Sequence, residues 1–180
     1  MASTAIGPAV AAGNVRCRRE GGVPRGSHIW YVVTMAKRSG GFGKALARGF
    51  LRTAVWLYRR SGGKIGGTMF GGPVLLLTTT GRRSGRSWTV PLLYQPDDVR
   101  WVLIASNGGN AKHPAWWLNL QAQPEASVQI GREIYPVTVI EATGEEREVL
   151  WRRMADMYKG YDRYAQKTTR KIPVVVLQRR

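Results

Sequence analysis

Six short runs of apolar and β-branched residues follow residue 73 and are separated by turn residues. They cover residues 74–80, 88–95, 99–106, 126–130, 132–142 and 172–178. Runs of this length and composition, bounded by turn residues, predict β-strands. Only two helical patterns interrupt them, which is not the regular βαβ alternation of a doubly wound sheet. The sequence therefore predicts a mainly β domain with helices (α+β), built on a small barrel or closed sheet.

The two interrupting helices have recognisable boundaries. The first covers residues 112–124 and has a proline near its first turn. The second covers residues 143–167, where Thr143 and Glu146 have the spacing of a capping box. Together with the strands, they predict that residues 73–180 form one domain.

The charge balance indicates an anionic partner. The chain has a formal net charge of +17, and residues 1–64 carry 12 Lys and Arg against a single acidic residue. Such an excess favours nucleic acid, an anionic membrane surface or a phosphorylated cofactor. One cysteine and two histidines exclude a disulfide framework and a Cys/His metal cluster, so we expect no metal and a reducing, cytoplasmic setting.

The first part of the chain is organised differently from the rest. Residues 1–34 lack the order of a secretion signal, and we expect a disordered extension with Met35 as an alternative start. Residues 35–72 are predicted to hold a basic amphipathic helix and a glycine-rich linker. No apolar run reaches the ~20 residues that a membrane-spanning helix needs.

The predicted helix over residues 42–60 separates apolar from basic side chains. The apolar face comprises Phe42, Leu46, Phe50, Thr53, Trp56 and Leu57, and the basic face Lys44, Arg48, Arg52 and Arg59. Leu51, Val55 and Tyr58 interrupt the polar side, which suits a helix with contacts on both sides. Two alternatives remain open: packing on the core, or peripheral attachment to the anionic inner face of the cell membrane. Nucleic acid is disfavoured, because no RNA-binding strand signature or zinc spacing accompanies the charge.

Two glycine-containing turns are candidates for anion binding. The first, in "TTTGRRSGRSWTVP", crowds Arg82, Arg83 and Arg86 beside three threonines, and such guanidiniums can grip phosphate or carboxylate. A solvated hairpin with incidental charge is the alternative. The second, "ASNGGNAKHPAWW", leaves a strand and enters a helix N-terminus, where free N–H groups attract anions. Neither common nucleotide-binding glycine motif occurs.

Three tyrosines share one spacing in the last predicted helix. Tyr158, Tyr161 and Tyr164 recur every three residues, so they would line roughly one side of a helix. Core packing accounts for one or two of them. Three tyrosines with polar neighbours indicate a pocket wall or a lid.

Four ordered segments resemble a known family. "PVLLLTTTGRRSGRSWTVPLLY", "ASNGGNAKHPAWWLNLQAQP", "MYKGYDRY" and "IPVVVLQ" are similar to the deazaflavin-dependent nitroreductases, actinobacterial enzymes that use reduced coenzyme F-420. The resemblance runs from about Pro73 to Gln178. It implies a six-stranded split β-barrel of the FMN-binding-like type.

The resemblance also implies site residues. The family grips the coenzyme's phosphate and glutamate tail with the basic loop, and the implied cofactor contacts are Thr80, Gly81, Arg82, Arg83, Ser84, Gly85, Arg86, Val90, Pro91, Leu92, Ala105, Ser106, Asn107, Gly108, Gly109, Pro114, Trp116 and Trp117. The three tyrosines would roof the substrate pocket. Tyr161 and Ser106 would hydrogen-bond the acceptor or deliver a proton. Asn107 stands where the resemblance leads us to expect a lysine.

The function implied is hydride transfer from reduced coenzyme F-420 to an electron-poor acceptor, either a quinone or a nitro compound. An alternative is a barrel that binds deazaflavin, FMN or haem without catalysis. A second alternative is a basic protein that binds polyanions through charge alone. The oligomeric state is left open.

Overall fold

The computed structural model describes residues 41–180, with side chains from residue 49 onward. The extension predicted over residues 1–34 and the alternative start at Met35 lie outside the described residues. The helices are α2 (Gly41–Ser61), η2 (Asn107–Gly109, a 3₁₀ turn), α3 (Ala115–Ala122), α4 (Gly144–Met157) and α5 (Gly160–Gln166). The strands are β1 (Thr68–Met69), β2 (Gly72–Thr80), β3 (Ser87–Leu93), β4 (Gln95–Asp97), β5 (Arg100–Ile104), β6 (Glu125–Ile130), β7 (Glu133–Glu141) and β8 (Val174–Arg179).

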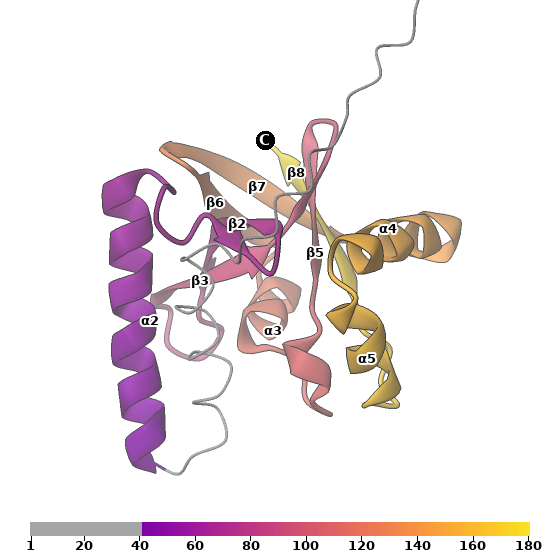
Figure 1. Cartoon of the computed structure of the whole chain (residues 1–180), viewed down its shortest axis with the longest axis horizontal. Coiled ribbons are helices and arrows are strands. Elements are labelled where there is room, and N and C mark those ends of the chain that lie inside the picture. Colours follow the sequence, from indigo (N-terminus) through magenta and orange to yellow (C-terminus); the bar gives the residue numbers. More distant parts are fainter. Residues whose placement is uncertain (1–40) are drawn as a thin grey trace, which may run out of the picture.

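All strand pairs are antiparallel and form one strongly curled sheet (Figure 1). The order is β1-β2-β6-β7-β8-β5-β4, and β3 pairs with β2. The chain changes partner at buried Tyr94, between β3 and β4, whose N–H donates to the carbonyl of Pro73 at 3.1 Å. The predicted barrel with helical insertions is confirmed. Strands β1 and β4 were not predicted, because two and three residues are too few to show a pattern.

The sheet buries both of its faces. On β2, Val74 and Leu76 belong to one hydrophobic cluster, while Leu75 and Leu77 belong to the other. The first cluster includes side chains of α2, α4 and α5, and the second includes those of α3. Burial on both faces explains why β2 is a continuous apolar run without the alternation of a half-exposed strand.

Helix α2 is confirmed, but the predicted orientation of its faces is wrong for the described side chains. Ala54, Val55 and Tyr58 are buried against the sheet, whereas Trp56, on the predicted apolar face, is 61% exposed. The small Ala54 allows close approach to the sheet, and Tyr58 contributes a polar anchor as well as a ring. The amphipathic pattern therefore predicted the wrong side of α2 to be buried.

The segment 61–72 is folded and does not behave as the predicted linker. The Tyr58 hydroxyl donates to the carbonyl of Val74 (2.9 Å) and accepts from the N–H of Gly131 (3.1 Å). Gly63 has a φ of +81°, and a Cβ there would lie 3.1 Å from the Cα of Gly131. These glycines permit close backbone approach and left-handed turns, so their role differs from that of a flexible spacer.

The last predicted helix is two helices, α4 and α5. Tyr158 lies between them, and a Cβ on Gly160 would clash with the Tyr158 ring. Thr143 is the N-cap of α4, but its side chain makes no capping hydrogen bond. Glu146 pairs with Arg100 at 2.9 Å, so the predicted capping box is wrong.

Replacing Tyr58 by phenylalanine tests whether this anchor holds α2 and the 61–72 segment on the barrel. Tyr58 is 1% exposed, and its loss would leave the Gly131 N–H without its acceptor. We expect Tyr58→Phe to lower the free energy of unfolding by about 1–3 kcal/mol in urea denaturation. Tyr135→Phe is the control, since no described residue hydrogen-bonds that hydroxyl. An equal effect of both variants would contradict the anchor.

Candidate functional site

The β2–β3 turn presents three cations. The N–H of Gly81 donates to the carbonyl of Arg86 (2.8 Å), and Gly85 closes the turn with a φ of +65°. Arg82, Arg83 and Arg86 are exposed, and none forms an ion pair with a described residue. Like charges on one short turn repel each other, and no described carboxylate offsets this repulsion. Binding of an anionic ligand to the turn would therefore be favourable.

A buried amide fixes the base of this turn. The Oδ1 of Asn119 accepts from both the backbone N–H and the Nη1 of Arg82 (3.2 Å each), and its Nδ2 donates to Thr79 Oγ1 (3.2 Å). Asn119 is 6% exposed and lies on α3. Sequence analysis missed it, because Asn119 acts on residues 37 and 40 positions away in the chain.

The β5–α3 turn has an unusual backbone. Asn107, Gly108 and Gly109 have consecutive positive φ values of 50°, 66° and 76°. The Nδ2 of Asn107 donates to the carbonyl of Lys112 at 2.8 Å. A Cβ on Gly109 would lie 2.9 Å from the carbonyl oxygen of Tyr164, so glycine allows this turn to touch α5. The two anion-binding candidates therefore flank α3, and the second contacts the tyrosine segment.

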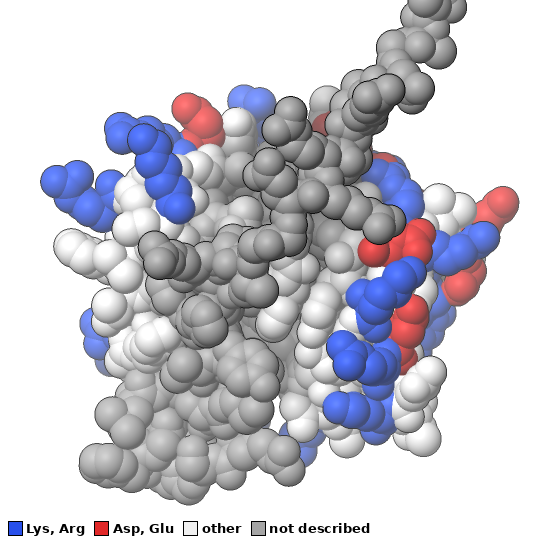
Figure 2. Space-filling model, viewed as in Figure 1, with Lys and Arg blue, Asp and Glu red and all other residues white. Residues whose placement is uncertain are grey.

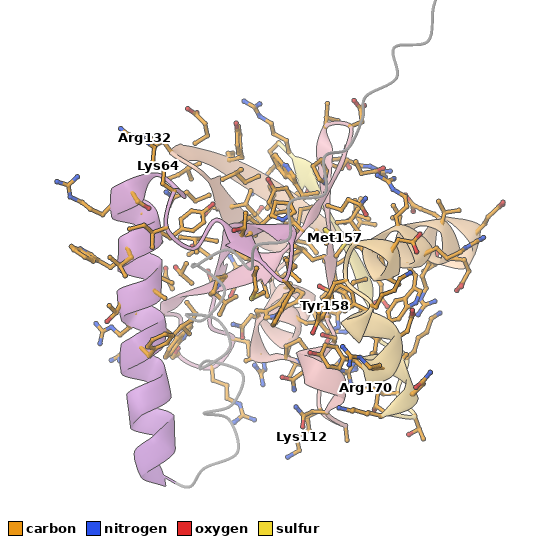
Figure 3. The ribbon with its side chains drawn as sticks, viewed as in Figure 1. Lys64, Lys112, Arg132, Met157, Tyr158 and Arg170 are labelled. Carbon is orange, nitrogen blue, oxygen red and sulfur yellow. The ribbon has the colours of Figure 1, made fainter. Side chains whose placement is uncertain are left out.

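Arg170, which is labelled in Figure 3, holds the second turn through its guanidinium group. Its Nη2 donates to the carbonyls of Ser106 (2.6 Å) and Ala105 (3.2 Å), and its Nε donates to that of Asn110 (2.9 Å). Its Nη1 lies 3.3 Å from His113 Nδ1. Partial burial lowers the pKa of Arg170 from its ordinary value. No motif identified this residue, because it acts on a turn some 60 positions away in the chain.

The three tyrosines are brought together despite the break in the helix. The hydroxyls of Tyr158 and Tyr164 lie 3.1 Å apart, and the ring of Tyr161 meets that of Tyr158 edge-on at 5.2 Å. Tyr161 is 5% exposed. Burial, the largest cause, raises the pKa of both Tyr158 and Tyr161 well above the ordinary value, so both phenols stay protonated at neutral pH and can donate hydrogen bonds.

The apolar members of the predicted site lie behind the turns. Ala105, Pro114, Trp116 and Trp117 are buried, and Val90 and Leu92 pack against the same cluster. The indole N–H of Trp117 is buried with no hydrogen-bond acceptor among the described residues. Pro91 pairs with Leu76 across β3 and β2. These residues form a hydrophobic wall that supports the two turns.

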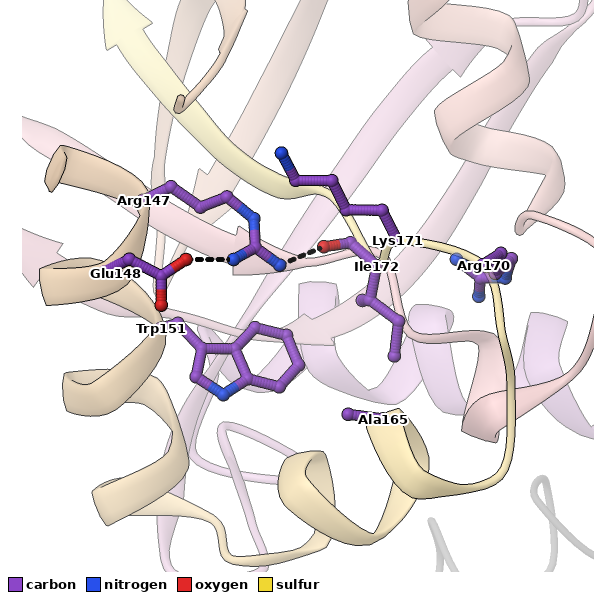
Figure 4. Close-up of a pocket in the computed structure, with 7 residues that line it drawn as sticks. All are labelled: Arg147, Glu148, Trp151, Ala165, Arg170, Lys171 and Ile172. Atoms are coloured by element: carbon purple, nitrogen blue, oxygen red, sulfur yellow. Dashed lines mark hydrogen bonds and ion pairs between the residues drawn. The ribbon is translucent and has the colours of Figure 1, made fainter. Parts of the chain in front are cut away.

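A pocket of about 310 Å³ lies elsewhere, between α4, α5 and the segment that precedes β8 (Figure 4). It is lined by Arg147, Glu148, Trp151, Ala165, Arg170, Lys171 and Ile172. None of the predicted site residues lines it. Two of its lining residues also contact the predicted site. Arg170 binds the β5–α3 turn, and the ring of Trp151 lies 6.5 Å from that of Tyr161. The described residues contain no cluster of three His, Cys, Asp or Glu that could bind a metal.

Residues 50–179 match the sequence profile of the family described as F420H(2)-dependent quinone reductase. The chain belongs to this family. It is 34% identical over 134 residues to the F420H(2)-dependent quinone reductase Rv1261c of Mycobacterium tuberculosis, an alignment covering 72% of this chain and 90% of that protein. The resemblance deduced from the four ordered segments is thereby confirmed.

Two solved structures share the fold of this chain, and the description of one names the same cofactor class. One is described as an F420-H2 dependent reductase, FDR-A, with 41% identity and a TM-score of 0.55 over 59% of this chain and 94% of that one. The other, described as a domain-swapped dimer, has the same identity and TM-score and is covered to 80%. The predicted split β-barrel is confirmed, and the chain is an oxidoreductase of the F-420 class. No described helix is long and apolar enough to cross a membrane.

Removing the Arg170 guanidinium should loosen the β5–α3 turn. Arg170→Leu removes the side-chain donor of the carbonyls of Ala105, Ser106 and Asn110, while the Gly109 N–H still donates to the Ser106 carbonyl at 3.0 Å. We expect amide hydrogen exchange at Gly109 to accelerate about tenfold or more, because the turn that holds this hydrogen bond opens more easily. Arg163→Leu, on exposed α5, is the control. Unchanged exchange in Arg170→Leu would contradict the positioning role.

Proposed function

We propose that this protein binds reduced coenzyme F-420 at the two turns beside α3 and reduces quinones at the tyrosine cluster. One observation carries the proposal: Arg82, Arg83 and Arg86 are exposed and have no acidic partner among the described residues. Nitro compounds are a second acceptor class for the same chemistry.

The residues present fit the coenzyme. Its phosphate and glutamate tail is strongly acidic, and guanidiniums bind such groups through charge-assisted, bidentate hydrogen bonds. The Asn119 amide holds one of these arginines in place before any ligand arrives. Asn107 supplies an amide where a lysine was expected, so the second turn offers one cation fewer.

When bound, the deazaflavin supplies a hydride, and the protein must orient the acceptor and exclude water. Val90, Pro91 and Leu92 provide an apolar strand along which a flat ring can lie, backed by the buried tryptophans. The protonated phenols of the tyrosine cluster donate hydrogen bonds to an acceptor oxygen on which negative charge develops. In this assignment Tyr161 is the catalytic donor, and the Ser106 hydroxyl is a second donor.

Two alternatives make different predictions. A barrel that binds deazaflavin, FMN or haem without catalysis would retain its ligand and show no turnover with any acceptor. A polyanion-binding protein would bind nucleic acid tightly, with affinity that falls steeply as salt rises. Turnover of menadione with reduced coenzyme F-420 excludes both as the main function.

The outer face of α2 suits contact with an anionic lipid surface. Trp56 is 61% exposed and is flanked by the exposed Arg52 and Arg59. Lys and Arg gather at the C-terminal end of α2 (Figure 2), where Lys64 and Arg132 lie (Figure 3). Interfacial tryptophan beside basic residues is the composition of a peripheral membrane helix. We therefore propose that α2 places the site beside lipid-soluble quinones.

Removing two arginines of the β2–β3 turn tests the cofactor assignment. We expect Arg82→Ala with Arg83→Ala to weaken coenzyme F-420 binding about tenfold or more, with a larger loss for longer glutamate tails. Arg152→Ala with Arg163→Ala removes the same charge from α4 and α5 and is the control. Equal affinities of the wild type and the first variant, measured by fluorescence titration, would refute the assignment.

Removing the Tyr161 hydroxyl tests the catalytic assignment. We expect Tyr161→Phe to lower kcat about tenfold or more and to leave coenzyme affinity within twofold. Because burial raises the Tyr161 pKa above its ordinary value, the wild-type rate should stay level through neutral pH and should not fall until pH passes 10. Tyr135→Phe is the control. Unchanged turnover in Tyr161→Phe would remove its role.

Vesicle sedimentation tests the membrane proposal. We expect the protein to sediment with phosphatidylglycerol vesicles at low salt, and Trp56→Ser to reduce the bound fraction severalfold. Trp88, another exposed tryptophan at 51%, gives the matched control Trp88→Ser. Equal binding of both variants would contradict the involvement of α2.

A further inference from the structure

The β1–β2 connection carries an aromatic residue in a strained position. Phe70 and Gly71 form a two-residue turn in which both φ values are positive, 51° and 85°. Such turns favour Asn-Gly, because a bulky side chain in the left-handed region is crowded by its own backbone. Turn formation alone therefore does not explain a phenylalanine here.

The Phe70 ring has a specific partner far along the chain. It stacks on the ring of Tyr158, with centroids 4.8 Å apart and planes inclined by 16°. The same Tyr158 touches Tyr161 edge-on and exchanges a hydrogen bond with Tyr164. Phe70 thus covers the tyrosine cluster, while 36% of its own surface remains exposed.

The arm that carries Phe70 is weakly attached. Strand β1 contributes only two register pairs, Thr68 with Pro73 and Met69 with Gly72. At the base Gly72 is closely packed, since a Cβ there would lie 2.9 Å from the sulfur of Met157 and 3.0 Å from Cδ2 of Leu93, and the flexible Met157 side chain can adapt to new neighbours. The turn can therefore move away from Tyr158 and leave the β2–β3 and β2–β6 pairing intact.

We propose that Phe70 is a selectivity-determining residue whose ring occupies the position on Tyr158 where a planar quinone would stack. A quinone ring is flat and electron-poor, and the phenol ring of Tyr158 is electron-rich, so quinone and Phe70 compete for one face. This inference rests on the proposed function, because it depends on the tyrosine cluster being the acceptor site. Flat bicyclic quinones displace Phe70 more readily than small non-planar acceptors do.

Replacing the ring and keeping the turn tests this competition. Phe70→Asn restores the favoured Asn-Gly pair and removes the competitor. We expect menadione to bind this variant about three- to tenfold more tightly, with a similar fall in KM and with kcat and coenzyme affinity within twofold. Menadione binding is measured without coenzyme, by quenching of tryptophan fluorescence. Phe70→Tyr keeps a ring and should behave as the wild type.

The β4–β5 turn provides a matched control. Val99→Asn changes an exposed apolar residue beside Asp98, which also has a positive φ (56°), and it should leave menadione affinity unchanged. Weaker or unaltered menadione binding in Phe70→Asn would overturn the proposal. Absence of wild-type turnover with reduced coenzyme F-420 and menadione would instead refute the proposed function, and the binding comparison separates the two failures.

Discussion

Repulsion among three guanidiniums on the β2–β3 turn is the constraint around which the site is organised. No carboxylate of a described residue relieves it, so the turn must be held in shape by neutral contacts. Asn119 provides them by tying Arg82 to α3 and α3 to Thr79. The consequence is a preformed basic turn whose charge is available to a ligand, which lowers the ordering cost of binding.

The β5–α3 turn is also held in shape by hydrogen bonds from a distant side chain, but there the turn accepts them. Here the backbone supplies carbonyls, and Arg170 supplies the donors that hold them. Three consecutive residues with positive φ orient this turn, and Gly109 lets it lie against α5. Helix α3 contacts the β2–β3 turn through Asn119 and directly follows the β5–α3 turn. Its buried tryptophans anchor it in the core, so the helix holds both turns in place.

Sequence patterns predicted the parts of the fold that depend on local composition. The six longer strands, the amphipathic helix and the crowded arginines all follow from periodicity and spacing. The patterns failed where tertiary contacts decide. Tyr58 selects the buried side of α2, and the last predicted helix is interrupted at Tyr158, whose ring fits only because residue 160 is a glycine. Asn119 and Arg170 act across 37 and about 60 residues, distances at which no motif carries a signal. The family resemblance named the cofactor, but only the structure revealed what positions its candidate contacts.

The proposed function requires that the acidic tail of coenzyme F-420 lies on the β2–β3 turn. A crystal structure of the protein with this coenzyme would show where the tail binds. We expect phosphate or carboxylate oxygens within hydrogen-bond distance of at least two of Arg82, Arg83 and Arg86. Density for the tail in the pocket beside Trp151, or anywhere remote from this turn, would contradict it.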